Sequence, residues 1–375
     1  MSSPAAPRVL AVSVASASLA AIVVLGAGCN EIIGLAGPAM GDGSSDGDTG
    51  SRRDSMCAAD PGSNPDAGPR SCEPGGPGLN DCPASGGGES CCISLSVPAG
   101  SYDRTYTNTG DGGTGRADLA TVSGFRLDKY EVTLARFAPF VSAWNNGCGW
   151  KPAPGSGKHT HLNGGLGLEN ASVPGQYEPG WVASDDAHIA PTSTSLGCDP
   201  NYATWSSRST SPSLPINCVN WWEAYAFCIW DGGFLPSEAE WEYAAAGGSL
   251  LREYPWGTAP PGTSNQYAIY ACHYPAGMGK CTGVAFIAPV GNPTLGAGVW
   301  GQLDLAGNVS EWNLDTYATY VEPCSNCAHL GSAPNRVFRG GDFEGPLRSL
   351  SPHDRDQELP AKRGYRVGFR CARVP

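Results

Sequence analysis

The sequence predicts a mixed α+β fold made of short helices, short strands and much irregular chain. Start and stop signals for two short helices follow one another between Pro215 and Gly248. Phe125 and Leu127 alternate with polar residues, as in a strand that buries one face. Glycine and proline supply 52 and 32 of the 375 residues, just below the roughly 25–30% share of low-complexity chains, so long loops are expected.

The first of these helices begins at a reciprocal capping pair. Asn220 can accept a hydrogen bond from the backbone N–H of Glu223, whose carboxylate reaches back to the N–H of Asn220. The glycine pair at 232–233 ends the helix. Large apolar residues recur between these ends at three- and four-residue steps, which predicts one buried face. The residues of that face are Trp222, Tyr225, Ala226 and Ile229.

The second helix repeats the same signals. Ser237 and Glu240 form its capping pair, and Gly247 provides the left-handed residue that ends it. Its inward residues are predicted to be Trp241, Ala244 and Ala245. An earlier helix is expected after Thr133, a possible N-cap. Its inward residues are predicted to be Phe137, Phe140 and Val141.

The sequence motif of the paired helices is specific. Residues 221–245 read W-x-x-A-x-x-[FY]-C-x-W-x-G-G-x-L-P-[ST]-E-A-E-W-E-Y-A-A, which closely resembles the signature of the sulfatase-modifying-factor family, whose founding member is the formylglycine-generating enzyme. Four further blocks agree in the same order, so a chance match is very improbable. They are Gly124–Val141, Tyr254–Gly257 (YPWG), Gly301–Trp312 (GQLDLAGNVSEW) and Arg336–Arg373. The resemblance covers about residues 120–375.

Family membership implies a fold. Members of this family elaborate the C-type-lectin architecture, with short helices, small antiparallel sheets and much irregular structure. The high glycine and proline content agrees with such a fold. We therefore expect an α+β, formylglycine-generating-enzyme-like domain over residues 91–375.

The last of the five blocks, Arg336–Arg373, is called the closing block here, and it contains the positions of the family's catalytic residues. In the formylglycine-generating enzyme, two cysteines shortly after the G-G pair bind copper and oxidise a substrate cysteine with oxygen. Counting from Gly340-Gly341, the matching positions here are Gly345 and Leu350, and the serine that follows the pair is replaced by Asp342. Glycine and leucine cannot replace thiolates as Cu(I) ligands. Copper is therefore not expected, and the catalytic pair is predicted to be missing.

The block Gly301–Trp312 suggests a calcium site. Glycines and turn formers let backbone carbonyls converge there, and Glu311 adds an anionic oxygen. The resemblance implies calcium ligands at Gly307, Asn308, Val309 and Glu311, the first and third through main-chain oxygens. The alternative is a tight core turn in which Glu311 bonds to the backbone. Ser310 departs from the family, which has tryptophan at that position.

The cysteine count favours disulfides. The chain has 15 cysteines, and 14 remain once Cys29 is set aside as a lipid-bearing residue. So many cysteines are typical of an oxidising compartment. The resemblance implies one particular bridge, between Cys228 and Cys371. Cys91 and Cys92 are adjacent, which suits bonding to two different partners.

The N-terminus carries export signals. Arg8 and the apolar run of residues 9–28 fit a secretory signal peptide. Residues 25–29, LGAGC, resemble a bacterial lipoprotein signal, with Cys29 as the lipidation site. Residues 30–90 are predicted to be a disordered Gly/Pro/Ser/Asp-rich tether, with a Cys-rich stalk at its end. The chain is expected to be exported, and either anchored as a lipoprotein of the bacterial cell envelope or secreted.

Charge limits the possible partners. The net charge is −12 and no basic face is evident, which argues against nucleic acid. Membrane contact is expected only through the lipid. Within the long stretch between Asn145 and Ser213, His159 and His161 could be metal ligands, although a surface loop closed by a disulfide is the simpler interpretation.

Three functions remain open at this point. The first is a non-oxidase binding or scaffold module that recognises a protein or glycan partner. The second is a formylglycine-generating oxidase that acts on a client sulfatase. The third is an enzyme with another metal centre in the stretch that contains His159 and His161.

Overall fold

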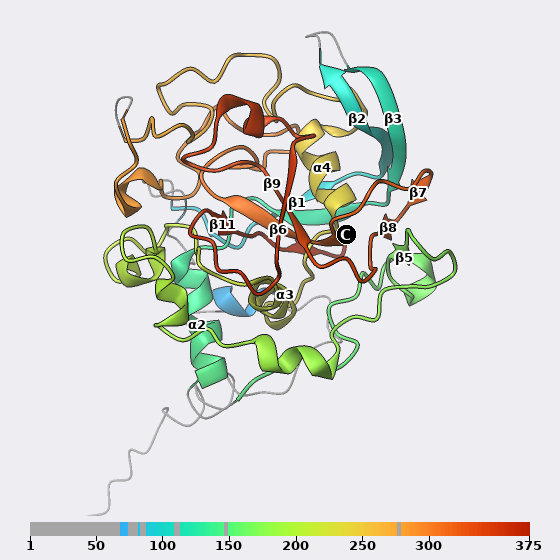
Figure 1. Cartoon of the computed structure of the whole chain (residues 1–375), viewed down its shortest axis with the longest axis horizontal. Coiled ribbons are helices and arrows are strands. Elements are labelled where there is room, and N and C mark those ends of the chain that lie inside the picture. Colours follow the sequence, from blue (N-terminus) through green and yellow to red (C-terminus); the bar gives the residue numbers. More distant parts are fainter. Residues whose placement is uncertain (1–67, 74–81, 83–87, 109–112, 146–148, 276–278) are drawn as a thin grey trace, which may run out of the picture. The chain divides into compact units, whose positions relative to one another are not determined.

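A computed structural model describes residues 68–73, 82, 88–108, 113–145, 149–275 and 279–375 (Figure 1). The predicted signal peptide, Cys29 and most of the predicted tether lie outside these residues. Across the described part of the chain, no helix has both the length and the apolar character that spanning a membrane requires.

The α+β prediction is confirmed, with short helices and small sheets in the described chain. The α-helices are α2 (Leu134–Asn145), α3 (Trp221–Trp230) and α4 (Glu238–Ala246). Short 3₁₀ turns occur along the rest of the described chain. They are η1 (Arg70–Cys72), η2 (Asn163–Gly165), η3 (Ala183–His188), η4 (Ser195–Gly197), η5 (Thr204–Ser207), η6 (Gly248–Leu250), η7 (Val284–Phe286) and η8 (Leu347–Leu350).

The strands form small separate sheets. One sheet has the order β1 (Ser94–Val97), β4 (Phe125–Asp128), β12 (Ala372–Arg373). A second has the order β10 (Arg355–Glu358), β9 (Arg336–Arg339), β6 (Ser310–Thr316), β11 (Val367–Gly368). A third has the order β2 (Gly100–Asn108), β3 (Gly113–Val122), β7 (Cys324–Ser325), and β5 (Glu169–Asn170) pairs with β8 (Cys327–Ala328).

The pairing is mixed rather than purely antiparallel. The pairs β11–β6, β3–β7 and β5–β8 are parallel, and each includes a strand of two residues. Parallel neighbours need long crossover connections. The long loops of this chain supply those connections, so the expectation of antiparallel sheets holds for only part of the strand pairing.

Helix α3 has the predicted ends but is buried more completely than predicted. The N–H of Glu223 donates to Asn220 Oδ1 at 2.9 Å, and the N–H of Asn220 donates to Glu223 Oε2 at 3.3 Å. Every residue of the helix except Trp222 is buried, rather than one face only. The outer side is covered by the preceding loops, in which His188 stacks on Trp222 with ring centroids 3.9 Å apart.

Helix α4 also begins and ends as predicted. The N–H of Ser237 donates to Glu240 Oε2 at 2.8 Å, and the N–H of Glu240 donates to Ser237 Oγ at 3.2 Å. Gly247 closes the helix with a φ of 69°. The β2–β3 ribbon lies alongside the helix (Figure 1), where the Tyr102 hydroxyl donates to the carbonyl of Ala239 at 2.9 Å.

The end of the chain is held at the centre of the fold. Strand β12 pairs with β4, so the last residues complete a sheet that the first strands of the domain began. The disulfide expected between Cys228 and Cys371 is present and ties α3 to the residue that precedes β12. A terminal strand of two residues would fray without such a tie.

The start of the domain lies earlier than expected. Cys91 and Cys92 bond to different partners, Cys82 and Cys72. Ser71, inside the predicted stalk, is fully buried against the domain. The expected boundary at residue 91 therefore falls inside a unit that two disulfides hold together.

Candidate functional site

The segment after β9 contains the positions where the resemblance implies redox cysteines. Gly340 and Gly341 have φ values of 98° and 69°, in the left-handed region that favours glycine. A Cβ atom on Gly341 would lie 2.6 Å from Ser349 Oγ. The glycine pair therefore lets the chain turn back onto η8.

Gly345 is tightly packed. It is buried, and a Cβ atom there would lie 2.7 Å from Ser349 Oγ and 3.1 Å from the carbonyl oxygen of Asp342. Its own carbonyl accepts the N–H of Ala271 at 3.0 Å. A cysteine at this position would require the Ser349 side chain to move aside and the backbone at Asp342 to shift slightly.

Leu350 fills a small apolar cluster. Its side chain is 1% exposed and packs with Tyr254, Ala268, Tyr270 and Ala306. Each cysteine in the described residues is bonded to another cysteine. The pairs are Cys72–Cys92, Cys82–Cys91, Cys198–Cys218, Cys228–Cys371, Cys272–Cys281 and Cys324–Cys327. Within the described chain, therefore, no free thiol is present to bind copper.

Aromatic and charged side chains gather beside Gly345. The rings of Tyr202 and Tyr365 stack with their centroids 4.6 Å apart. The Tyr365 hydroxyl donates to Glu344 Oε2 at 3.1 Å, and burial raises the pKa of Asp342 to about 6. All of these side chains are partly exposed. Sequence reasoning missed the pairing of Tyr202 with Tyr365, because the two residues lie far apart in the chain.

The predicted calcium block forms a buried turn. Both oxygens of Glu311 accept hydrogen bonds from Arg370 at 2.7 Å, and Glu311 Oε2 also accepts the indole N–H of Trp241 at 2.8 Å. Asn308 Oδ1 accepts the N–H of Ala288 at 3.0 Å. The side-chain oxygens expected to bind calcium are thus engaged by the protein itself.

Two further acids lie at this turn. Glu131 accepts the side-chain N–H of Asn308 at 2.7 Å and the N–H of Val309 at 3.0 Å. Burial, together with the charges of Asp304 and Glu311, raises the pKa of Glu131 well above its ordinary value. Burial also raises the pKa of Asp304 to about 6. Protonation of Glu131 and Asp304 can therefore reduce the electrostatic repulsion between these carboxyl groups.

As placed, the four predicted residues do not fit a calcium site. The guanidinium of Arg370 already balances Glu311, and the described residues contain no cluster of three or more His, Cys, Asp or Glu side chains suited to a metal ion. The contacts favour the alternative of a tight core turn, although Glu311 bonds to side chains there rather than to the backbone. We therefore expect no calcium at these four residues, which melting of the protein in calcium and in a chelator tests.

A comparison with known protein families shows the family of this chain. A family model described as "Sulfatase-modifying factor enzyme 1-like domain" matches residues 87–375. The chain belongs to this family. The resemblance inferred from the five sequence blocks is thereby confirmed, and the matched range begins shortly before the predicted start at residue 91.

Known relatives include proteins named as enzymes and proteins named as inactive. The chain is 30% identical over 283 residues to the formylglycine-generating enzyme of Thermomonospora curvata, covering 70% of this chain and 86% of that protein. It is 33% identical over 165 residues to the inactive C-alpha-formylglycine-generating enzyme 2 of Mus musculus, covering 42% of this chain and 49% of that protein. PvdO from Pseudomonas aeruginosa shares the fold, with a TM-score of 0.50, 22% identity and coverage of 80% and 99%.

His159 is a buried structural residue in this sulfatase-modifying-factor domain. Its side chain is fully buried and lies between two carboxylates, with Nδ1 3.1 Å from Glu178 Oε1 and Nε2 3.0 Å from Glu240 Oε2. Burial disfavours the charged imidazole, but the two carboxylates outweigh it and raise its pKa to about 10. His159 is therefore protonated at neutral pH.

This placement contradicts both sequence interpretations of the histidine pair. Both ring nitrogens of His159 are engaged by carboxylates, so it does not join His161 as a metal ligand. It is not part of a surface loop either, because it anchors the stretch that contains it to the start of α4. Cys198, which lies in that stretch, is bonded to Cys218, which lies after it.

Two arginines of the last block, Arg339 and Arg355, bond to acidic side chains of α4. Arg339 Nη2 lies 2.7 Å from Glu238 Oε1 and 3.0 Å from Glu242 Oε2. Arg355 bonds to both oxygens of Glu238 at 2.7 Å. These pairs hold β9 and β10 against α4, and burial raises the pKa of Glu242 to about 7.

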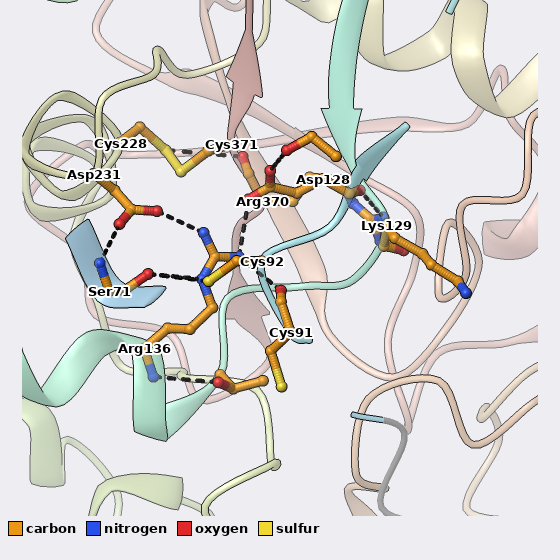
Figure 2. Close-up of polar contacts among 12 residues, drawn as sticks. Ser71, Cys91, Cys92, Asp128, Lys129, Arg136, Cys228, Asp231, Arg370 and Cys371 are labelled. Carbon is orange, nitrogen blue, oxygen red and sulfur yellow. Dashed lines mark hydrogen bonds and ion pairs between the residues drawn. A yellow bond between two sulfur atoms is a disulfide. The ribbon is translucent and has the colours of Figure 1, made fainter. Parts of the chain in front are cut away.

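A second buried network joins the N-terminal segment to the family domain (Figure 2). Arg136 lies 2.9 Å from Asp128 and 2.6 Å from Asp231, and all three side chains are fully buried. Arg136 Nε donates to Ser71 Oγ at 3.2 Å, and the N–H of Ser71 donates to Asp231 at 2.8 Å. Arg373 adds a second positive charge beside both aspartates. Ser71 therefore completes a network in which the charges balance.

Proposed function

We propose that this chain is a non-oxidase member of the sulfatase-modifying-factor family that acts as a binding or scaffold module at the bacterial cell envelope. One observation carries the proposal: Gly345 and Leu350 occupy the positions of the family's redox cysteines. The packing around them supports it. Gly345 is tightly packed against Ser349 and Asp342, and Leu350 is an apolar packing residue.

The surface beside Gly345 is the face that we assign to partner binding. Tyr202, Tyr365, Glu344 and Arg366 combine aromatic rings with charges of both signs. Aromatic side chains and arginine are enriched in protein interfaces, and tyrosine combines an apolar ring with a polar hydroxyl. A protein or glycan partner fits this chemistry better than nucleic acid does, because the chain is acidic.

The envelope location rests on the N-terminal sequence. The apolar run and Cys29 support export and lipid attachment. The six disulfides in the described residues are consistent with an oxidising compartment. We propose that the lipid holds the domain at the membrane while the tether lets it reach its partner.

A direct assay separates this proposal from the alternative of a formylglycine-generating oxidase. The full chain is incubated with a cysteine-containing sulfatase-motif peptide, copper and oxygen, and the peptide aldehyde is measured by mass spectrometry. We expect no aldehyde, because Gly345 and Leu350 cannot bind Cu(I) as thiolates do. The formylglycine-generating enzyme of Thermomonospora curvata serves as the positive control.

Copper-dependent turnover by this chain would overturn the proposal. Metal analysis of the purified protein provides an independent check, since stoichiometric copper or iron would favour an enzyme. The alternative is supported by the 30% identity to a protein named as formylglycine-generating enzyme. That identity extends over most of the family domain and does not replace the two missing thiols.

A further inference from the structure

A disulfide lies directly beside the segment that contains Gly345. Cys272 and Cys281 are bonded to each other and both are partly exposed. The N–H of Cys272 donates to the carbonyl of Phe343 at 2.8 Å, and the N–H of Ala271 donates to the carbonyl of Gly345 at 3.0 Å. The backbone at Ala271 and Cys272 is thus hydrogen-bonded to the segment in which the family has a redox cysteine.

The backbone around this disulfide is unusual. Ala271 and Cys272 are consecutive residues with φ values of 47° and 60°, a left-handed conformation that is uncommon for residues other than glycine. Such strained backbone clusters at functional sites. The hydrogen bonds to the segment 343–345 hold these two residues in place.

The two sulfur atoms have different surroundings. The N–H of Cys281 donates to Cys272 Sγ with a distance of 3.1 Å. A donor at that sulfur stabilises a thiolate there, which makes Cys272 the better leaving group in thiol–disulfide exchange. Cys281 Sγ lies 3.9 Å from the carbonyl oxygen of Phe343, which offers no such stabilisation.

We propose that Cys272–Cys281 is an exchangeable disulfide that reacts with a cysteine thiol of a peptide or protein partner. The incoming thiolate attacks Cys281 Sγ and forms a new S–S bond. The Cys272–Cys281 bond breaks, and its electron pair leaves on Cys272 as a thiolate held by the N–H of Cys281. A second partner thiol then attacks the partner sulfur of the mixed disulfide, and Cys281 leaves as a thiolate. The two partner thiols are thereby oxidised to a disulfide, and Cys272–Cys281 is reduced.

Two of the other described disulfides provide matched controls. Cys82–Cys91 encloses a loop of the same sequence separation, 9 residues, but both of its cysteines are fully buried. Cys72–Cys92 is also partly exposed at both ends. Its sulfurs contact serine hydroxyls at 3.4 Å or more, and neither cysteine has a positive φ. The first pair controls for loop size and the second for exposure.

The test uses the oxidised full chain and reduced glutathione as the thiol probe, without copper or denaturant. Samples are quenched in acid at intervals, free thiols are alkylated, and each cysteine peptide is quantified by mass spectrometry. We expect Cys272–Cys281 to open at least about tenfold faster than either control pair, because its leaving thiolate is stabilised. The first adduct should be glutathione on Cys281 with Cys272 free.

Equal opening of the three pairs, or faster opening of Cys72–Cys92, would overturn the proposal. An adduct that forms first on Cys272 would overturn the assigned direction of attack. The variant Cys272→Ser with Cys281→Ser should lose the fast-forming adduct, and persistence of that adduct would also contradict the proposal. Because the experiment contains no copper and measures no aldehyde, its result is separate from that of the formylglycine assay.

Discussion

His159 illustrates how the surroundings of one residue decide its charge. A fully buried histidine would ordinarily be neutral, because burial disfavours the charged form. Glu178 and Glu240 lie on opposite sides of this ring and hold it protonated. The resulting ion pairs join the stretch before Ser213 to the capping box of α4, since Glu240 takes part in both.

This arrangement predicts a pH-dependent stability. The pKa of His159 is raised from 6.5 to about 10 in the folded chain, so the folded state holds its proton more tightly than the unfolded state. The stabilisation is complete below about pH 6.5 and is lost as the pH rises toward 10. Thermal melting between pH 6 and 10 should show a decline that is weaker in His159→Gln. An equal decline in both proteins would contradict the assignment.

The surroundings of Glu311 give a second prediction about a single residue. Changing Glu311 to Gln leaves Arg370 buried without its balancing charge, which should lower the free energy of unfolding by about 3 kcal/mol. Because Arg370 already engages both carboxylate oxygens, we expect the melting temperature of the parent protein to be the same in calcium and in a chelator. Denaturant unfolding and thermal melting measure the two effects.

Glu344→Gln provides the matched control for Glu311→Gln, because it removes one negative charge from a partly exposed site outside the turn. A calcium-dependent rise in the melting temperature that Glu311→Gln abolishes and Glu344→Gln keeps would show that the turn binds calcium after all. A ligand that binds only the folded state stabilises it by mass action.

At the scale of elements, the short terminal strands depend on ties from elsewhere. Strand β12 contributes two residues to its sheet, too few to be stable alone. The disulfide between Cys228 and Cys371 joins it to α3, and Arg373 bonds to Asp231 just after that helix. The buried helix thus organises the C-terminus as well as the core.

Replacing Cys228 and Cys371 together by alanine should lower the free energy of unfolding by a few kcal/mol. The bridge spans a sequence separation of 143 residues. For a loop of that size the chain-entropy model gives about 5 kcal/mol, which residual structure in the unfolded state reduces. Urea unfolding of the parent and the double variant measures the difference. No loss of stability would contradict the role assigned to this disulfide.

At the scale of the whole molecule, the N-terminal region has two roles. Part of it belongs to the folded domain, because Ser71 is buried and Cys72 and Cys82 are bonded to the domain's first residues. The region before it carries the predicted export and lipid signals. Ser71 and the disulfides of Cys72 and Cys82 therefore attach the described N-terminal residues to the domain.

Lipidation of Cys29 predicts a change in location. The variant Cys29→Ser should move the protein from the membrane fraction to the soluble fraction of a bacterial host and abolish labelling by a fatty acid. Cys57→Ser, a change at another cysteine of the N-terminal region, should leave both unchanged. Labelled protein that persists in Cys29→Ser would contradict the assigned lipidation site.

The sequence by itself determined the features that depend on residues close together in the chain and on the sequence motifs of the family. The capping pairs Asn220–Glu223 and Ser237–Glu240 set the starts of α3 and α4, because such bonds form within one helical turn. The five ordered blocks identified the family, and with it the α+β fold and the Cys228–Cys371 bridge. The same blocks located Gly345 and Leu350 where the family has its redox cysteines.

The tertiary structure alone decided which distant side chains meet. His159 acquired its charge from Glu178 and Glu240, and Glu311 became the partner of Arg370, because folding brings together groups that lie 19 to 81 residues apart in the chain. No local rule predicts such pairs. Their energies depend on burial, which strengthens a satisfied ion pair and penalises an unpaired one, and burial is a property of the completed fold.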